Sequence, residues 1–334
     1  MMELAATAVT ATRGMLESTH PVKAKWERIN TNPLPRSSHT LSVIAGRAYI
    51  FGGEVSPREP VDNNMQIVTL PYDAFSSADY QTIPAKSKTV GGEVPEKRVV
   101  SGRTNDLWGF DVRSRTWKEF PAAPGKPRGG TSITVSKHRI YRYGGFNGTG
   151  EEGGQVDILD LGIDTLSGTG PSTEAAVVAK GKWHTLDFTK ENMTCPGNRS
   201  VAGLHAITTG MGREYLVLLF GERDPSSQGH DGAGKFWGDI WAFQCPPLDM
   251  TGASFKDATW QALGKESGQG KWSAMQVADA EGAEGDDIHK LVPSERGWFA
   301  SSTMGDLDAS SIVLWGGLNG KNEREDDGWI LRIE

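Results

Sequence analysis

The sequence predicts an all-β propeller, and three repeated patterns favour that fold class. The first is a short apolar strand that ends in glycine, found at 48–54, 139–146, 216–222 and 312–318. The second is a strand of alternating polarity that follows each glycine-ended strand. The third is a short strand around a tryptophan. Because these patterns recur in a fixed order with variable loops between them, we expect successive four-stranded blades.

The strands of a blade are expected in the following order. An inner strand comes first, in SSHTLSVI, GGTSITVS, SVAGLHAIT and GWFASSTM. The glycine-ended strand is second, where glycine permits a positive φ and close backbone approach. Alternating third strands are expected at 105–111, 154–160, 238–244 and 326–332, and tryptophan strands at 25–29, 116–120, 182–188 and 259–263.

The two ends of the chain complement each other. The tryptophan strand at 25–29 precedes the first blade, whereas the last blade ends without one. We therefore expect residues 25–29 to pair with the strand at 327–332 and to close the ring. The predicted organisation is a disordered tail at 1–24 followed by one propeller domain at 25–334.

The number of blades follows from the arginines that precede the inner strands. There are five of them but only four glycine-ended strands, and the interval between the second and third arginines is too short for four strands. These arginines are Arg36, Arg98, Arg128, Arg199 and Arg296. Segments 64–70 and 79–83 are expected to finish the first blade. The prediction is four complete blades and one abbreviated blade at 97–120.

Composition limits the classes of function. The chain has 334 residues and a formal net charge of −7, without a basic stripe, so no nucleic-acid partner is expected. Its two cysteines lack metal-type spacing and indicate no disulfide framework. No apolar run approaches about 18 residues, and the first residues lack a signal-peptide pattern, so we expect no membrane association and a cytoplasmic location.

The order of arginine, small residues, strand, glycine-pair strand and tryptophan strand resembles the kelch repeat, whose propellers commonly have six blades. Three segments extend the resemblance: PRSSH…YIFGGE…PVDN, FGERDPSSQGHDGAG and PSERGWFASST…GGLN…NER…D. In this order they resemble the plant nitrile- and epithio-specifier proteins and their fungal kelch relatives. The resemblance covers most of residues 25–334.

This resemblance implies an iron(II)-dependent enzyme of secondary metabolism, because the plant specifiers redirect the unstable aglycone of a glucosinolate. Their metal motif is Glu, three residues, Asp, three residues, His. Glu222 and His230 match its ends, but Ser226 occupies the middle position, and the nearest acid is Asp224. Two carboxylates and one histidine would suit Fe(II) or Mn(II). The alternative is a structural turn, because Asp-Pro-Ser-Ser is ordinary turn chemistry.

The resemblance also implies that arginines at blade openings hold the anionic group of a substrate. The alternative is that each arginine pairs with an acid of a neighbouring blade, such as Glu54, Glu222 or Asp157. Trp298 and Phe299 are expected either to stack on a substrate or to plug the channel. His39 is a candidate general base or a hydrogen-bonded structural histidine. The candidate catalytic residues are Arg36, His39, Arg128 and Arg296, and the candidate substrate-binding residues are Glu54, Arg98, Arg199, Trp298 and Phe299.

Further residues are assigned to the core. His205 lies inside an apolar strand and is expected to be a hydrogen-bonded core histidine. Trp108, Trp241 and Trp329 recur in the third strands and are expected to pack between blades.

Three functions remain open from the sequence. The first is a specifier-like lyase or isomerase that acts on a small reactive metabolite, anionic or sulfur-bearing, with Fe(II) as its cofactor. The second is a metal-free cyclase or isomerase of a natural-product pathway. The third is a non-catalytic kelch scaffold that binds a protein partner through its loops.

Overall fold

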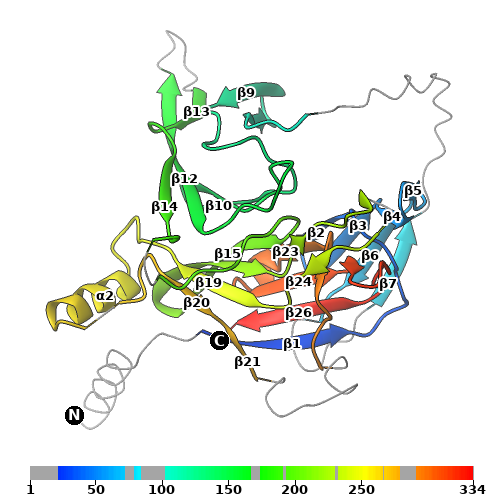
Figure 1. Ribbon diagram of the computed structural model, residues 1–334. Helices are drawn as coiled ribbons and strands as arrows, with labels where there is room; N and C mark the ends of the chain where they lie inside the picture. Colours follow the sequence, from blue (N-terminus) through cyan, green and yellow to red (C-terminus); the bar gives the residue numbers. More distant parts are fainter. Residues whose placement is uncertain are drawn as a thin grey trace.

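The computed structural model describes residues 22–71, 79–83, 102–166, 174–190, 193–229, 232–265, 267–278 and 291–333. Four sheets form a ring-like arrangement, as expected for a propeller (Figure 1). Within the described residues, no helix has the length and apolar character needed to cross a membrane.

Each of the four sheets contains the predicted order of strands. Blade I contains β2 (Thr40–Ile44), β3 (Arg47–Phe51), β6 (Met65–Thr69) and β7 (Asp79–Ile83). Blade II contains β10 (Ser132–Ser136), β11 (Arg139–Tyr143), β12 (Gln155–Leu166) and β14 (His184–Asp187). Blade III contains β15 (Gly203–Thr209), β16 (Arg213–Leu219), β19 (Ile240–Gln244) and β20 (Trp272–Ala274). Blade IV contains β23 (Ala300–Thr303), β24 (Ser311–Trp315) and β26 (Gly328–Ile333).

The N-terminal strand completes blade IV, as the sequence predicts. Strand β1 (Lys23–Ile29) runs antiparallel to β26, with Ala24 opposite Ile333 and Ile29 opposite Gly328. The short strand β21 (Gln276–Val277) pairs in parallel with the start of β1. Both ends of the domain therefore belong to one sheet.

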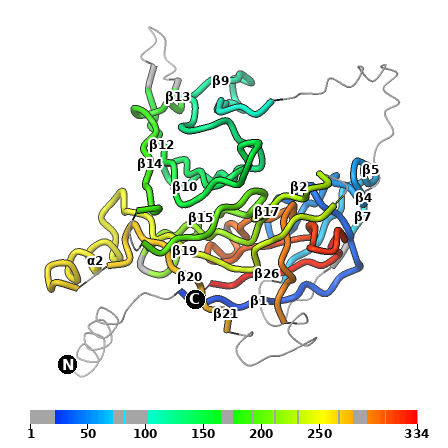
Figure 2. The backbone as a smooth tube through the Cα atoms, in the orientation of Figure 1, coloured from blue at the N-terminus to red at the C-terminus, as the bar shows by residue number. Residues whose placement is uncertain are grey.

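The abbreviated blade consists of a two-stranded sheet, β8 (Leu107–Asp111) with β9 (Thr116–Phe120). It lies beside blade II, because Arg113 and Lys118 donate hydrogen bonds to the Ala175 and Val177 carbonyl oxygens of β13 (Glu174–Ala179). Strand β13 pairs with the extended outer half of β12 and was not predicted. Figure 2 shows the β9 hairpin next to β13, away from β2.

One predicted strand and one predicted core residue are wrong. Residues 259–263 lie at the end of helix α2 (Gly252–Ala262), which begins with a capping box between Thr251 and Ser254. The fourth strand of blade III is formed instead by Trp272 and its neighbours in β20. Trp108 is 48% exposed, because the abbreviated blade has no inner pair of strands among the described residues to cover it.

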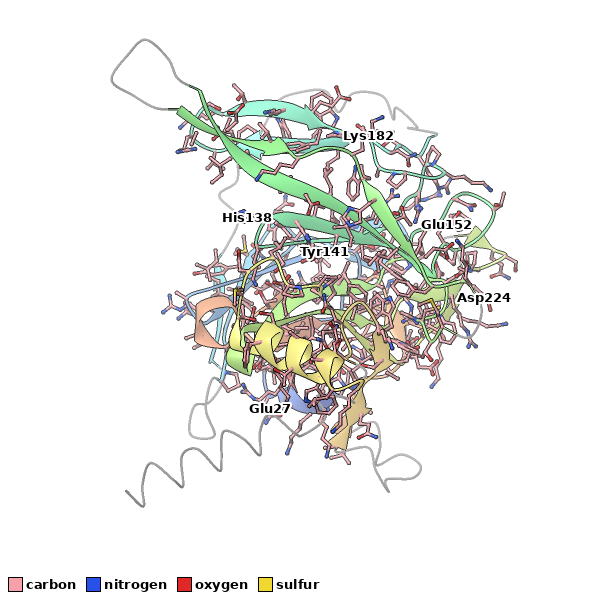
Figure 3. All side chains as sticks on the ribbon, turned by 90° about the vertical axis from the view of Figure 1, so that its left-hand side faces the viewer. Glu27, His138, Tyr141, Glu152, Lys182 and Asp224 are labelled. Carbon is pink, nitrogen blue, oxygen red and sulfur yellow. The ribbon has the colours of Figure 1, made fainter. Side chains whose placement is uncertain are left out.

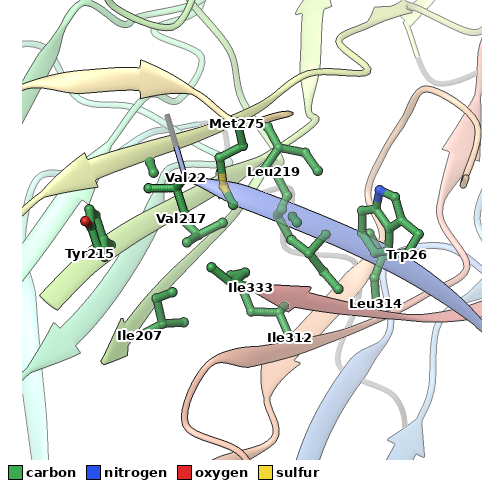
Figure 4. Close-up of a cluster of buried hydrophobic side chains, with 14 of the residues drawn as sticks. Val22, Trp26, Ile207, Tyr215, Val217, Leu219, Met275, Ile312, Leu314 and Ile333 are labelled. Atoms are coloured by element: carbon green, nitrogen blue, oxygen red, sulfur yellow. The ribbon is translucent and has the colours of Figure 1, made fainter. Parts of the chain in front are cut away.

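Apolar side chains fill three seams between sheets. One cluster joins blades I and IV, a second joins blades IV and III, and a third joins blades III and II. Figure 4 shows the second cluster, where Trp26 from β1 lies against residues of blades III and IV. Its indole stacks on Phe220 at a centroid distance of 5.9 Å and meets Trp329 edge-on at 6.3 Å. The cyclic order is I–IV–III–II, with the β8–β9 hairpin beyond blade II.

Short two-stranded sheets form where the chain leaves the glycine-ended strands of blades I, III and IV. They are β4 (Glu54–Ser56) with β5 (Glu59–Pro60), β17 (Glu222–Asp224) with β18 (Lys235–Phe236), and β22 (Arg296–Gly297) with β25 (Leu318–Asn319). Among the residues that the structure describes, the remaining elements are two 3-10 turns, η1 (Gly210–Gly212) and η5 (Gly305–Leu307).

We predict that Trp26→Ala lowers the free energy of unfolding by about 3–5 kcal/mol, because it removes a buried indole from the seam that closes the ring. Trp26 is only 4% exposed. Trp117→Ala is the control, since Trp117 is 67% exposed and should cost about 1 kcal/mol or less. Urea unfolding followed by circular dichroism measures both. Equal losses would contradict the closing role of β1.

We also predict that amide hydrogens of β8 and β9 exchange faster than those of β16. Strand β16 is buried along its whole length and paired on both sides, whereas β8 and β9 pair only with each other and expose most of their side chains. Native-state hydrogen exchange with peptide-level mass spectrometry tests this. Equal protection of the two regions would mean that the hairpin unfolds together with the ring.

Candidate active site at the propeller mouth

The blade-opening arginines each form the same hydrogen bond. The Nη1 atoms of Arg36, Arg128, Arg199 and Arg296 donate to the carbonyl oxygens of Gly52, Gly144, Phe220 and Gly316 at 3.0, 3.1, 2.8 and 3.1 Å. The accepting residue always follows the second strand and has a positive φ, between 50° and 71°. All four arginines are buried, at 6% exposure or less. The guanidinium group is therefore part of the blade's own framework.

Three of these arginines also contact an acid. Arg128 lies 3.9 Å from Asp157, one of the acids that the structural alternative named, and the other two form closer pairs. Arg199 forms two hydrogen bonds with Asp239, and Arg296 pairs in the same way with Asp327. Burial opposes ionisation of Asp327, but the bond and charge of Arg296 hold the pKa of its carboxyl below the ordinary value. The acids belong to the same blade rather than to a neighbour.

Asp239 and Asp327 also accept a hydrogen bond from a tryptophan two residues later in the chain. Trp241 and Trp329 donate to Asp239 and Asp327, both at 2.7 Å. Trp108 donates to Asp106 in the same way at 2.9 Å, so the β8–β9 hairpin keeps this part of the repeat. Arg98, the opening arginine of that blade, lies outside the described residues.

A chain of backbone hydrogen bonds brings the four openings together at one mouth. The amide of Ser38 donates to Trp298, that of Trp298 donates to Val201, and that of Val201 donates to Gly130. Each of these residues lies two positions after its arginine and has a positive φ. The bonds join blades I, IV, III and II in turn, so the loops around the arginines converge around one axis.

Two aromatic candidates contribute to this mouth differently. The Trp298 backbone is a link in the chain of amides, and its side chain is half-buried. Phe299 packs at the seam between blades III and IV, where its ring meets Phe220 edge-on at 6.0 Å. Packing is thus established for Phe299, and substrate stacking by either residue stays a prediction.

His39 lies three positions after Arg36 and is 8% exposed. Neither ring nitrogen has a hydrogen-bond partner among the described residues. Burial, followed by the Arg36 charge, lowers the pKa of His39 to about 3. The imidazole is therefore neutral at physiological pH. His205 behaves as expected for a core histidine, because its Nε2 is 2.7 Å from the Ser301 hydroxyl.

Glu54 and Glu222 occupy equivalent places in blades I and III. Each follows the left-handed residues after the second strand and pairs through its backbone with the residue after the opening arginine, Ser37 or Ser200. Their surroundings differ. The Glu54 carboxylate contacts Arg324 at 3.5 Å and accepts from the Arg58 amide. Glu222 is 8% exposed and has no such cation among the described residues.

The Glu222 carboxylate instead has an acidic neighbour, Glu151, which the sequence analysis missed. Burial, followed by the charge of Glu151, raises the pKa of Glu222 to about 7. Burial also raises the pKa of Glu151 to about 7, although the Ser200 hydroxyl opposes this shift by donating to its Oε1 at 3.2 Å. The available signal was position, since Glu151 follows the glycine pair of blade II in the loop before β12.

Asp224, another predicted metal ligand, lies near Glu151, because the charge of Asp224 also raises the pKa of the Glu151 carboxyl. Asp224 is mostly exposed and contacts Lys235 at 3.5 Å. The Ser226 hydroxyl accepts from the Gln228 amide, as in the turn that the sequence suggested. His230 lies outside the described residues. Within the described part of the chain, no group of three or more His, Cys, Asp or Glu side chains is arranged to hold a metal.

The chemical capacity of the mouth therefore centres on Glu151, Ser200 and Glu222. Two carboxylic acids with pKa values near 7 can exchange protons close to neutral pH. The same oxygens are suitable ligands for a hard or borderline divalent cation.

Comparisons with known proteins agree with the repeat structure. No family model matches the chain. The N-(sulfonatooxy)prop-2-enimidothioate sulfolyase of Thlaspi arvense is 25% identical over 357 residues, which cover 93% of this chain and 98% of that protein. An F-box/kelch-repeat protein of Arabidopsis thaliana is 24% identical over 92% of this chain and 57% of its own length. Host cell factor 1 of Homo sapiens is 27% identical over 37% of this chain and 7% of its own length.

Among solved structures, that of YjhT covers 90% of this chain and 84% of its own, with 14% identity and a TM-score of 0.41. This superposition is too loose to add to the argument. The sheet topology and the kelch relatives together identify a kelch-type propeller related in sequence to a sulfolyase.

We predict that His39 makes the fold sensitive to acid. Its folded pKa of about 3 lies below the ordinary 6.5, so the neutral histidine contributes stability above pH 6.5 that is lost as pH falls toward 3. The loss should reach about 2–4 kcal/mol, since one pKa unit corresponds to about 1.4 kcal/mol. Urea unfolding of the wild type and His39→Gln between pH 7 and 4 tests this. The variant should show a shallower loss, and exposed His184→Gln should keep the wild-type slope.

Proposed function

We propose that this protein is a specifier-like lyase or isomerase that acts on a small reactive metabolite at the propeller mouth with the aid of Fe(II). The observation that carries the proposal is an acidic pair, half-buried Glu151 and buried Glu222, at the end of the ring where the blade openings converge. Alignment with a sulfolyase along nearly the whole of both chains supports the reaction class.

The arrangement of donors fits a bound divalent cation. Glu151 Oε2 is buried without a hydrogen-bond partner in the described structure, and Glu222 lacks a compensating cation there. A buried carboxylate without a partner is costly, and a metal ion is one of the groups that removes this cost. Bound iron would supply a Lewis acid. The protein residues would hold it, orient the substrate and shield the mouth from water.

The proposed substrate class is a small imidothioate whose nitrogen carries a sulfonatooxy group. This class is taken from the name of the sulfolyase relative. An anionic group of this kind would be attracted to a metal at an otherwise acidic mouth.

A second candidate function is protein binding. The F-box/kelch-repeat relative supports it, as do the exposed aromatic side chains of the β8–β9 hairpin, Phe110 and Trp117. These side chains belong to the β8–β9 hairpin, whereas the acidic pair belongs to blades II and III, so separate variants test the two functions.

The test is an anaerobic assay of protein loaded with Fe(II), with N-(sulfonatooxy)prop-2-enimidothioate as the substrate. Sulfate release and the organic products are compared with those of the substrate alone. We expect faster sulfate release or a changed product ratio. Glu222→Gln should reduce the effect at least ten-fold, whereas Glu119→Gln, at an exposed position of β9, should retain it. Products that match the enzyme-free reaction would eliminate this substrate class and favour the protein-binding function.

A further inference from the structure

The blade-opening arginines, to which the family resemblance assigns anion binding, are used inside the blades. Each guanidinium group is buried and donates to a backbone carbonyl oxygen. Two of them also form close ion pairs with acids of their own blades. A different cationic side chain would therefore have to meet an anionic substrate at the mouth.

Arg223 is a cationic side chain that a β-bulge presents at the mouth. The register of β17 against β18 shifts between Glu222 and Asp224, so Arg223 is the extra residue of β17. Bulges redirect a side chain and are frequent next to active sites. Glu222 is buried, whereas Arg223 is exposed. Figure 3 labels Asp224, the next residue, on the same side of the molecule as Glu152 of the blade II loop.

The Trp237 ring holds the Arg223 guanidinium in place. Arg223 Cζ lies 5.2 Å from the ring centroid, and Arg199 Cζ lies over the same ring at 5.1 Å. The indole Nε1 donates to the Asn198 carbonyl oxygen at 3.0 Å. Gly197 leaves room for the indole, because a Cβ at that position would lie 2.4 Å from the ring. The ring is thus fixed, and an arginine stacked on it loses less freedom when it binds a ligand.

The charge of Arg223 is available to a ligand. No acid forms an ion pair with Arg223 among the residues that the structure describes, and the adjacent Asp224 carboxylate contacts Lys235 at 3.5 Å instead. Because Arg223 is exposed, an anion from solution can approach it without unfolding the loop.

The equivalent positions of the other blades carry no charge. Val55 is the extra residue of the matching bulge in blade I. Asn147 and Asn319 follow the glycine pairs of blades II and IV, and their side-chain amides bond within their own turns. Of these four positions, only that of blade III provides a cation. The feature therefore distinguishes one side of the mouth and is not a property of the repeat.

We propose that Arg223, held by Trp237, binds the anionic group of the substrate at the blade III side of the mouth. The planar fork of a guanidinium group matches two oxygens of a sulfate ester. Adjacent Cα atoms are about 3.8 Å apart, so a small substrate bound by Arg223 lies close to Glu222 and to a cation held there. This inference deepens the proposed function, on which it rests, by naming a substrate-binding side chain.

The first test uses inorganic sulfate as the probe, with no substrate present. Phenylglyoxal modifies exposed arginines, and peptide mass spectrometry gives the rate at each one. Mn(II) is present throughout, because the acidic pair would otherwise repel sulfate. We expect sulfate to slow the modification of Arg223 at least three-fold relative to chloride at equal ionic strength. Arg115 is the internal control, because it is exposed in the β8–β9 turn and should react at the same rate in both salts.

The second test follows turnover of the sulfonatooxy substrate by iron-loaded variants, each shown to be folded by thermal unfolding. Arg223→Gln should raise KM at least ten-fold and change kcat less than three-fold, because the side chain binds the substrate and does not act on the reacting atoms. Arg223→Lys should recover only part of the loss, since it keeps the charge without the planar fork. Arg115→Gln, which removes the same charge elsewhere, should keep the wild-type KM.

The outcomes separate this inference from the proposed function. Modification of Arg223 at the same rate in sulfate and chloride would overturn the inference, as would an unchanged KM in Arg223→Gln. Specific protection of Arg223 by sulfate, in a protein that leaves the sulfonatooxy substrate unchanged, would overturn the proposed function alone.

Discussion

The mouth of this propeller depends on one repeated hydrogen bond, from an opening arginine to the carbonyl of the left-handed residue that ends the second strand. A left-handed turn directs that carbonyl into the blade, where it would be buried without a partner. The guanidinium satisfies it. The turn also determines where the next residues emerge, so Glu54 and Glu222 come out at the same place in blades I and III. In blade III the left-handed position is occupied by Phe220, whose ring packs against Trp26 and Phe299.

Repeat-level features could be predicted from the sequence because each has a local cause. Glycine after each apolar strand predicted the four sheets. The unmatched strands at the two ends of the chain predicted the pairing of β1 with β26. The tryptophan at 260 was misassigned because two candidate segments followed β19, and the capping box at Thr251 made the first of them helical. Glu151 was missed because its neighbour Glu222 is distant in sequence, and only the seam between two blades brings them together.

The abbreviated blade shows which strands of a repeat pair with each other without the other strands of the blade among the described residues. The β8–β9 hairpin corresponds to the outer two strands of a blade and keeps the bond from Trp108 to Asp106. Outer strands pair locally, across a short turn, so they need no inner strand to define their register. The apolar side chains of the outer strands, however, need an inner strand to bury them. Trp108 and Phe110 are therefore half-exposed, whereas Trp329, at the same place in a complete blade, is 1% exposed.

The charge at the mouth constrains what the site can bind. The guanidinium groups of the blade-opening arginines are buried and donate to carbonyls, while Glu222 is buried within the influence of the Glu151 charge, and no cation is paired with either in the described structure. An anionic metabolite alone would be repelled there, and a second carboxylate would be left unpaired. A divalent cation between the two glutamates would reverse the local field and give an anion a favourable contact. Because the acidic pair would repel an anion, binding of an anionic substrate at this site depends on prior binding of a cation. Cation binding and substrate binding therefore form one hypothesis rather than two.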